Sequence, residues 1–274
     1  MVHIAGAEDM PALCELWRQG FEEAEAEARF AIEEFTGLSG VYLCEENGAP
    51  AAMACAVPVT LREKNGFYLY GVTTAAALRG QGVMTRFLEQ LHALLKERGA
   101  AFTVLIPQTP GLYGFYQKRG YETAFYLRRF QCEIKNNLWA AAQFDTVTLR
   151  DFLSLRQKWV GENGVLLPRK AAGAVLKDLY SSGASTIAAE YGYGVYFIEK
   201  DELFFEELFA RDDHAAALLL EAARQHTGCE RARGLLSSGS TLLPGTGSLE
   251  PFGMICYLEK AFSVQDAYMN LMLN

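Results

Sequence analysis

The sequence predicts an α/β (α+β) fold in which a mixed sheet is flanked by helices, with the whole arrangement duplicated. Short β-branched and apolar runs alternate with segments whose apolar residues recur at helical spacing. In the first half the elements follow the order β, α, α, β, β, β, α, β, α, β and end near residue 135. When Gly228 is aligned with Gly99, the second half repeats this order. The repetition indicates an internal duplication at the level of the fold.

The composition is typical of a globular protein. The chain has 274 residues, of which 50% are hydrophobic and 21% are charged, and this length is sufficient for two domains. It has no run of eighteen apolar residues, and its first residues lack a basic segment followed by an apolar core. We therefore expect neither a membrane-spanning helix nor a secretion signal, and we predict a cytoplasmic protein.

Charge and cysteine spacing argue against two kinds of ligand. The formal net charge is -8 and the isoelectric point is near 5.2, which argues against nucleic acid and is compatible with cationic small molecules. The six cysteines form no C-x-x-C pair, and the four histidines form no metal or catalytic constellation. We expect reduced, buried thiols and no metal. A homo-oligomer is compatible with the sequence.

Strands of the first half are expected where β-branched, aromatic and small apolar residues cluster between turns. These runs are residues 2–5, 40–46, 51–62, 66–74, 101–107 and 124–134. The fifth run, AFTVLIP, is apolar throughout, as expected of a strand buried on both faces. The turn NGAP separates the second run from the third.

Two helices are expected between the first strand and the second. Asp9 begins the first of them, and Met10, Leu13 and Trp17 fall at helical spacing and give it one apolar face. The segment FEEAEAEARFAIEEF, residues 21–35, continues as a second helix with a dense acidic face. A solvated helix face explains these charges, although they could also attract a cationic substrate.

The third helix is predicted from Gly82 to Arg98. Its apolar stripe includes Phe87 and Leu91, and Gly99 stands where a helix stop belongs. A short helix bounded by glycines is expected within PGLYGFYQKRGYE, residues 110–122.

The second half is a weaker copy, joined to the first by the connector KNNLWAAAQFD. Its predicted helices are residues 149–160, 167–183 and about 213–225, and its predicted strands are 185–192, 194–200, 202–210, 232–238 and 252–260. We place one domain at residues 1–137 and a second at 145–274.

The stretch LRGQGVMTRF, residues 78–87, predicts an anion site. Gly80 and Gly82 let the backbone approach a phosphate, Arg79 adds a charge, and the first N–H groups of the following helix lack partners. The chain has no Lys-Ser/Thr pair here, and the third glycine of a dinucleotide fingerprint is absent. Neither a nucleoside triphosphate loop nor a dinucleotide loop is therefore indicated.

The segments VTTAAALRGQGVMTRFLEQL and LYGFYQKRGYE together resemble the GNAT superfamily of N-acetyltransferases. Arg79 and Gly82 match the family's loop pattern, and a second pattern is matched by Tyr116, Gly120 and Tyr121. Met84 departs from the usual Gly or Ala, which should matter little because the loop binds through main-chain N–H groups.

The resemblance implies a GNAT acyl-CoA N-acyltransferase fold and an acetyl-CoA site. In the family, the loop holds the pyrophosphate and the preceding strand contacts the pantetheine arm. The implied cofactor contacts are Val72, Thr73, Thr74, Arg79, Gly80, Gln81, Gly82, Val83, Met84 and Thr85. Tyr116 matches the usual general acid, and Tyr113 is the fallback or a further cofactor contact. A strand N–H near Val72 would contact the carbonyl oxyanion.

The general base is not indicated by the sequence. Strand 66–74 has no carboxylate, whereas many relatives place a glutamate there. Glu63 lies at the strand's edge, and Glu33 and Glu34 lie on the second helix. All three are expected to be surface charges, so we favour proton removal through ordered water.

The second half is predicted to lack the phosphate site. At the equivalent junction it reads ELFARDDHAAALLL, where Asp212 and Asp213 would cap the helix and repel a phosphate. A catalytic first half with such a degenerate copy partly resembles acetyltransferases of the enhanced-intracellular-survival type. In those proteins the terminal carboxylate reaches the active site. For the tail ending at Asn274 we favour a packing or dimer-contact role, with the carboxylate role as the alternative.

We therefore predict an acetyl-CoA-dependent N-acetyltransferase. The acceptor would be the primary amine of a small molecule, with a cationic one among the candidates, attacking directly while Tyr116 acts as the acid. One alternative is transfer of another acyl or aminoacyl group on the same fold. Another is a non-catalytic acyl-CoA sensor.

Overall fold

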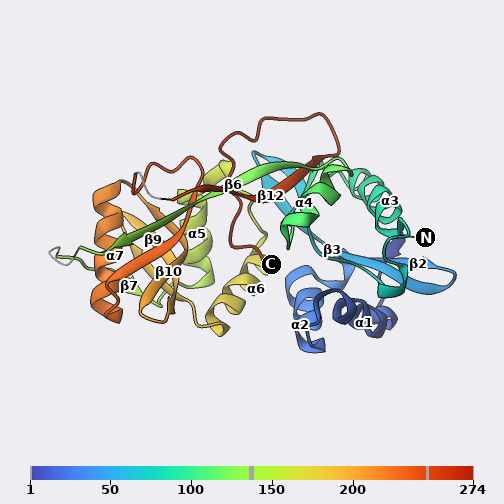
Figure 1. Cartoon of the computed structure of the whole chain (residues 1–274), viewed down its shortest axis with the longest axis horizontal. Coiled ribbons are helices and arrows are strands. Elements are labelled where there is room, and N and C mark those ends of the chain that lie inside the picture. Colours follow the sequence, from blue (N-terminus) through green and yellow to red (C-terminus); the bar gives the residue numbers. More distant parts are fainter. Residues whose placement is uncertain (1, 136–138, 245–246, 274) are drawn as a thin grey trace.

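One mixed sheet runs the length of the molecule, with helices packed on both faces (Figure 1). The computed structural model describes residues 2–135, 139–244 and 247–273. Within these ranges the sheet has twelve strands in the order β1-β2-β3-β4-β5-β12-β6-β11-β10-β9-β8-β7. The predicted class, an α/β fold with a mixed sheet and flanking helices, is confirmed.

The strands are β1 (Val2–Ile4), β2 (Val41–Glu46), β3 (Ala49–Leu61), β4 (Lys64–Thr74), β5 (Phe102–Leu105), β6 (Glu122–Glu133), β7 (Gln143–Phe144), β8 (Ser185–Ala189), β9 (Gly192–Glu199), β10 (Glu202–Ala210), β11 (Arg231–Ser237) and β12 (Leu249–Tyr257). The α-helices are α1 (Met10–Phe21), α2 (Glu25–Arg29), α3 (Val83–Glu97), α4 (Pro110–Gln117), α5 (Leu149–Trp159), α6 (Arg169–Ser181) and α7 (Asp213–Thr227).

The first half is an antiparallel meander followed by one parallel crossover. Strands β1 to β4 pair antiparallel in sequence order, and β5 joins β4 in parallel after the chain has crossed through α3. The apolar stripe of α3, which includes Phe87 and Leu91, packs on one face of the sheet. The apolar face of α1, which includes Trp17, packs on the other.

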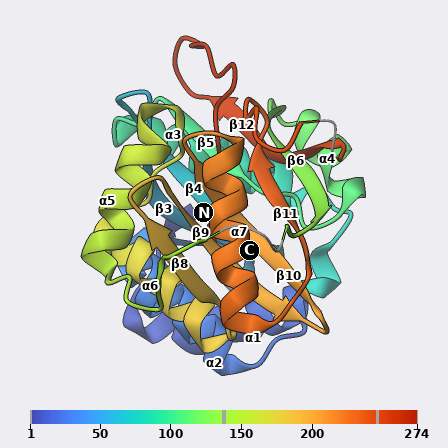
Figure 2. The same cartoon turned by 90° about the vertical axis from the view of Figure 1, so that its left-hand side faces the viewer.

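The second half repeats this plan. Strands β8, β9 and β10 are antiparallel neighbours, and β11 joins β10 in parallel after the chain has crossed through α7. Figure 2 shows α7 lying across this part of the sheet, as α3 does in the first half. Helices α5 and α6 precede the meander, as α1 and α2 do in the first half.

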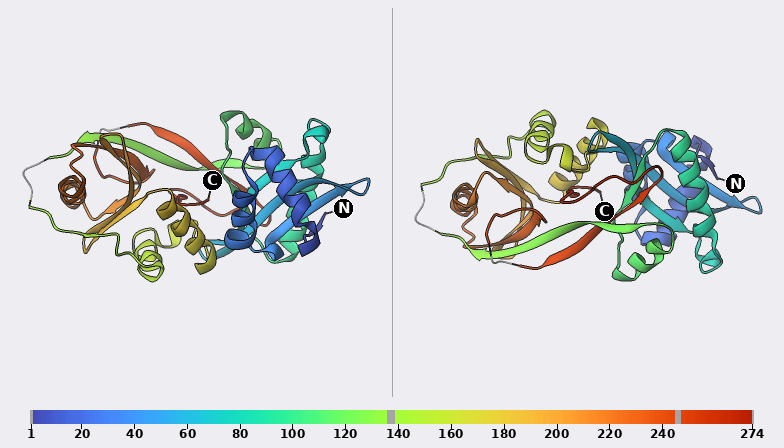
Figure 3. Two further views of the ribbon diagram at one scale, coloured as in Figure 1. Left: turned by 90° about the horizontal axis from the view of Figure 1, so that it is seen from below. Right: turned by 90° about the horizontal axis from the view of Figure 1, so that it is seen from above.

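The two halves exchange their last strands. β12, from the end of the chain, pairs with β5 of the first half, and β6 pairs with β11 of the second half. β12 and β6 also pair with each other at the centre of the sheet. The two long ribbons that connect the halves in Figure 3 are these strands. The parallel strand β5 of the first half is therefore paired with β12 from the second half. The parallel strand β11 of the second half is paired with β6 from the first half.

One helix differs from its prediction. The segment 21–35 does not continue as a helix, because α1 ends at Phe21 and Glu22 takes the left-handed conformation with φ of 59°. α2 begins only at Glu25 and passes into a π-helical stretch, Phe30–Thr36. The indole N–H of Trp17 donates to the Glu23 carboxylate at 2.8 Å, which holds the chain in this turn.

Candidate active site

A β-bulge in β4 is the first element of the site. Thr73 pairs with Met53 and Tyr70 pairs with Cys55, so Gly71 and Val72 together face a single residue of β3. Gly71 has φ of +60°, and a Cβ there would lie 2.4 Å from the Trp17 ring. Both constraints require glycine. The bulge leaves backbone polar groups of β4 outside the ladder, facing the neighbouring cavity.

Two adjoining cavities lie where β4 and β5 diverge. The parallel pairing ends at Tyr68 and Val104, and beyond it the strands separate. The outer cavity, of about 440 Å³, lies against the glycine loop. The inner cavity, of about 230 Å³, lies between the diverging strands. The cavities share part of their lining, namely Phe21, Val72, Gln108, Leu112 and Tyr116. Together they form one path from the loop into the sheet.

The glycine loop has the geometry of an anion site. Gly80 and Gly82 both have φ of +78°, a conformation that favours glycine. Gly82 is the N-cap of α3 and has no side chain with which to bond the first amides of the helix. A Cβ on Gly80 would meet no atom within 4 Å. The first N–H groups of α3 therefore have neither an intrahelical acceptor nor a capping side chain.

Two arginines border the outer cavity. Arg79 donates from Nε to the Thr74 carbonyl at 3.2 Å and from Nη2 to the Gln19 carbonyl, so its side chain ties the loop to the end of α1. Arg119 donates to the Thr85 hydroxyl, at 2.6 Å from Nη2. Its guanidinium carbon lies 3.4 Å from the centre of the Phe115 ring. Burial lowers the pKa of Arg119 from its ordinary value. Arg119 is a site residue that was not predicted from the sequence.

Most of the predicted cofactor residues meet in one place. Those that line the outer cavity are Val72, Thr73, Thr74, Arg79, Gly80, Gly82, Val83, Met84 and Thr85. Gln81 is outside this lining and is exposed, with its side-chain amide donating to the Ala77 carbonyl at 2.9 Å. Tyr113 also lies outside the lining of both cavities, and its hydroxyl donates to the Phe252 carbonyl of β12 at 3.0 Å.

Tyr116 lies at the junction of the two cavities. It extends from α4, lines both cavities and is only 7% exposed. Burial raises the pKa of Tyr116 to about 12, although the nearby Arg119 opposes the shift. Its hydroxyl has no hydrogen-bond partner within the described ranges. The phenol is therefore a protonated donor that faces the path with its hydrogen unused.

Aromatic rings and one carboxylate surround the inner cavity. Tyr68 and Tyr70 stack with ring centres 6.0 Å apart, and Phe21 lies beside them on the wall. Burial raises the pKa values of Tyr68 and Tyr70, so both hydroxyls stay neutral. Glu23 is the only acidic side chain among the described residues of this lining. Aromatic faces and a carboxylate together favour a cation or an amine.

The glutamates considered earlier as bases lie elsewhere. Glu33 pairs with Arg29 at 3.1 Å, and Glu34 pairs with Lys177 at 3.1 Å, both at the surface. Glu63 is exposed in the turn between β3 and β4. All three are absent from the described lining of both cavities. Glu23 was not among the glutamates considered as bases, because the turn that brings it to the cavity interrupts the helix predicted over residues 21–35.

The equivalent junction of the second half is closed to anions. Asp212 is the N-cap of α7 and accepts the N–H of Ala215 at 2.8 Å. This backbone bond and the neighbouring Arg211 lower the pKa of Asp212. Asp213 accepts the N–H of Leu243 at 2.7 Å. The Asp212 carboxylate thus uses a helix amide that a phosphate would need, and Asp213 adds a second negative charge beside it.

The C-terminal segment reaches the first half. The Tyr68 hydroxyl donates to the backbone carbonyl of Leu273 at 2.7 Å, and both residues are buried. Asn274, for which a carboxylate role was considered, lies outside the described residues.

A further cavity, of about 630 Å³, lies in the second half. It opens beside β7 and the start of α5, where the N-cap Thr148 already accepts the N–H of Asp151. Its one cation, Lys158, donates to the Glu190 carbonyl at 3.2 Å. This cavity therefore offers no anion site comparable to the glycine loop.

The described ranges hold neither a metal-binding cluster nor a membrane-spanning helix. They contain no cluster of three or more metal-ligating side chains. None of their helices is long and apolar enough to cross a membrane.

Comparisons with known proteins agree with the geometry. Residues 2–124 match the family model described as an acetyltransferase (GNAT) domain. A search of the curated proteins finds no match. Among solved structures, a conserved protein of unknown function from Enterococcus faecalis V583, described as a probable N-acyltransferase, is similar with a TM-score of 0.74 and 18% identity. That alignment covers 94% of this chain and 73% of the other.

Two more solved structures resemble this chain over 94% of its length. A GCN5-related N-acetyltransferase from Kribbella flavida has a TM-score of 0.74 at 18% identity, with 72% of its own chain covered. Eis1 from Mycobacterium abscessus has a TM-score of 0.73 at 11% identity, with 74% covered. At these identities the likeness establishes the fold, and it confirms the expected partial resemblance to proteins of the Eis type.

Proposed function

We propose that the chain transfers the acetyl group of acetyl-CoA to the primary amine of a small molecule, because residues 2–124 match the family model described as an acetyltransferase (GNAT) domain. The observation that carries the proposal is the continuous path from an uncapped helix N-terminus to a buried tyrosine and an aromatic cavity. Acetyl-CoA would supply an acyl group already activated as a thioester.

The glycine loop would bind the pyrophosphate. The first amides of α3 point into the outer cavity, and the dipole of this fifteen-residue helix favours negative charge there. Arg119 would add positive charge from α4's end of the cavity, whereas Arg79 chiefly fixes the loop. Gln81 and Tyr113 are proposed only as outer contacts, since their polar groups already have partners.

The bulge of β4 would stabilise the oxyanion. Gly71 and Val72 lie next to Tyr116 in the inner cavity, and the bulge releases backbone polar groups from the ladder. An N–H held rigidly at this point donates to the negative charge that develops on the transferred carbonyl.

Tyr116 would protonate the departing thiolate. A phenol with a pKa of about 12 stays protonated at neutral pH and can donate a hydrogen bond to the negative charge that develops on the departing sulfur. Because the parent thiol has a pKa near 8.5, full proton transfer requires a lower pKa of Tyr116 in the complex, and the positive charge of Arg119 acts in that direction. The unpartnered hydroxyl supports this role, because no internal bond has to break before it donates.

The acceptor would bind in the inner cavity. Its aromatic walls and the Glu23 carboxylate suit an ammonium group, and Glu23 would hold it at the rim before deprotonation. Removal of the proton through ordered water is retained as the proposed base mechanism. A homo-oligomer and a cytoplasmic location also stay as proposals.

The second half is proposed to be a non-catalytic copy. Asp212 caps α7, and the adjacent Asp213 adds a second negative charge that opposes phosphate binding, which supports one cofactor site per chain. We propose a catalytic domain at residues 1–137 and a degenerate domain at 145–274, and this division refers to their functions and not to separate sheets. The strand exchange means that neither part has a complete sheet of its own.

Calorimetry and a thiol-release assay test the proposal. Acetyl-CoA should bind at one site per chain, and CoA should be released only with an amine acceptor. Binding of a different acyl-CoA with turnover would favour the alternative of another acyl group. Binding without turnover on any amine, unchanged by Tyr116→Phe, would favour the sensor.

A further inference from the structure

The second half has a gap between its parallel strands, as the first half does. β10 and β11 pair from Glu202 with Arg231 to Phe205 with Gly234, and then they diverge. β10 has its own irregularity between Phe205 and Glu207, in the position of the β4 bulge. In the first half the corresponding gap holds the inner cavity.

The chain's own C-terminal segment occupies the gap in the second half. The Tyr268 ring packs edge-on against Phe209 of β10 at 5.2 Å. It also belongs to one buried cluster with Leu235 of β11 and Leu127 of β6. Tyr268 is 4% exposed. Residues 267–273, called the terminal segment below, are almost entirely buried.

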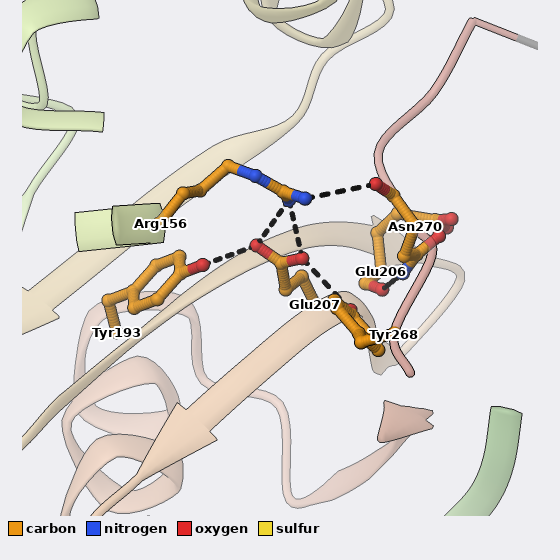
Figure 4. A network of polar contacts seen from close by, with 6 residues as sticks. All are labelled: Arg156, Tyr193, Glu206, Glu207, Tyr268 and Asn270. Carbon is orange, nitrogen blue, oxygen red and sulfur yellow. Dashed lines mark hydrogen bonds and ion pairs between the residues drawn. The ribbon is translucent and has the colours of Figure 1, made fainter. Parts of the chain in front are cut away.

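A buried ionic cluster holds this segment (Figure 4). Arg156 Nη1 donates to both oxygens of the Glu207 carboxylate, at 3.0 and 2.7 Å. The Tyr268 hydroxyl donates to Glu207 Oε2 at 2.9 Å, and the Tyr193 hydroxyl donates to Oε1. Glu207 is 0% exposed. Its charge therefore depends on these donors, one of which belongs to the terminal segment.

Asn270 adds a second attachment. Its side-chain amide donates to the Glu206 carbonyl at 2.6 Å, and its backbone carbonyl accepts from Arg156 Nη2 at 3.2 Å. If the segment left this place, Arg156 would lose an acceptor and Glu207 would lose a donor, both in a buried environment. The cluster therefore favours the docked segment strongly.

The terminal segment connects the cluster to the proposed acceptor cavity. Three residues after Asn270, the carbonyl of Leu273 accepts the hydroxyl of Tyr68 at 2.7 Å. Tyr68 forms part of the inner cavity's wall and stacks on Tyr70. In Figure 1 the C label lies between the two halves, in agreement with this path.

We propose that Arg156, Glu207 and Tyr268 are positioning residues for the acceptor site of the other half. The terminal segment fills the gap between β10 and β11, and these three residues anchor it there. The anchored segment places the Leu273 carbonyl so that it fixes the Tyr68 hydroxyl in the wall of the inner cavity. This inference rests on the proposed function for its catalytic consequence. The docking of the terminal segment does not depend on the proposed function.

A pair of matched variants tests the proposal. Tyr268→Phe and Tyr193→Phe each remove one hydroxyl donor from the same carboxylate, but only Tyr268 belongs to the terminal segment. Hydrogen exchange at the amides of residues 267–273 should be about tenfold faster in Tyr268→Phe than in Tyr193→Phe. The KM for the acceptor should rise about fivefold in Tyr268→Phe alone, with the KM for acetyl-CoA unchanged within about twofold.

Equal exchange in the two variants would overturn the anchoring role. Faster exchange without a change in the acceptor KM would overturn the positioning role. If acetyl-CoA does not bind the unmodified protein, the proposed function fails, whereas the exchange comparison still decides whether Tyr268 anchors the segment. Asn270→Ala, which removes the bond to the Glu206 carbonyl, should act as Tyr268→Phe does, and exchange at the wild-type rate would count against the anchor.

Discussion

The carboxylate of Asp212 caps α7 by accepting the N–H of Ala215 at 2.8 Å. The corresponding helix of the first half begins after Gly82, which has no side chain and a φ of +78°. The same helix N-terminus therefore occurs in both halves of the chain. In α7 an aspartate accepts a bond from the first amides, whereas in α3 no side chain does so. We expect this difference between the two helix N-termini to determine which half holds a phosphate.

Gly82→Asp should give α3 an acidic N-cap like the one that Asp212 provides for α7. We expect the affinity for acetyl-CoA to fall by about a hundredfold, because the new carboxylate would bond the helix amides and repel the phosphates. Calorimetry measures the change. Gly99→Asp is the control, since Gly99 at the other end of α3 has a similar φ of +84° and open space around it. An equal loss in both variants would point to backbone strain alone.

Tyr116→Phe should lower kcat by about a hundredfold and leave the acetyl-CoA affinity within about twofold. The hydroxyl has no described partner, so the melting temperature should change little. Steady-state kinetics with calorimetry provides the test. Tyr113→Phe removes a hydroxyl bonded to Phe252 and should keep kcat within about threefold. If Tyr113→Phe causes the larger loss, the acid is Tyr113.

Glu23→Gln should raise the KM for a cationic amine about tenfold, with little effect on kcat, because it removes the negative charge at the inner cavity. The amide can still accept the bond from Trp17, so the turn after α1 should persist. Glu27→Gln, on the exposed face of α2, is the matched control. Identical acceptor kinetics in the two variants would remove Glu23 from the site.

Glu206→Gln should stabilise the protein at high pH. Burial, and then the neighbouring Glu207, raise the pKa of Glu206 from 4.5 to about 6. The folded state therefore binds more protons than the unfolded state between these values, and stability falls as the pH rises through this window. The neutral variant should gain up to about 2 kcal/mol at pH 8 and nothing at pH 4.

Thermal unfolding at both pH values measures this effect. Glu259→Gln, at an exposed position, should show no such difference. A gain that is equal at pH 4 and pH 8 would assign the effect to packing rather than to ionisation.

Residues 1–137 expressed alone should not form a stable domain. Without β12, strand β5 keeps an unpaired edge, and β6 loses both β12 and β11. We expect a broad, non-cooperative thermal transition by circular dichroism, compared with the full chain as the control. A cooperative transition with acetyl-CoA binding would show that the first half tolerates the loss.

The sequence predicted the local elements well. The run ELFFEELFA coincides with β10, and the stops at Gly99 and Gly228 lie at helix ends with left-handed backbone. These features depend on periodicity and on glycine's conformational freedom, which are local properties. The loop residues that line the outer cavity were predictable for the same reason, because they are consecutive in the chain.

Features that depend on distant partners were not predictable. β6 and β12 both have strand patterns, but no pattern indicates which parallel strand each one joins. Arg119 and Glu23 reach the cavities through the placement of α4 and through the turn after α1. Glu207 lies in a run of charged and apolar residues that does not indicate a buried carboxylate. Its partner Arg156 is 51 residues away, and Tyr268 is 61 residues away.

The exchanged strands also set an order of events during synthesis. β5 is complete at Leu105, but its neighbour β12 does not exist until the ribosome has made residue 257. The sheet that carries the glycine loop must therefore wait, with an open edge, while well over a hundred further residues emerge. A pause or a nonsense mutation in the second half before the end of β12 at Tyr257 would leave that edge exposed. We expect such nascent chains to depend on chaperones and to aggregate without them.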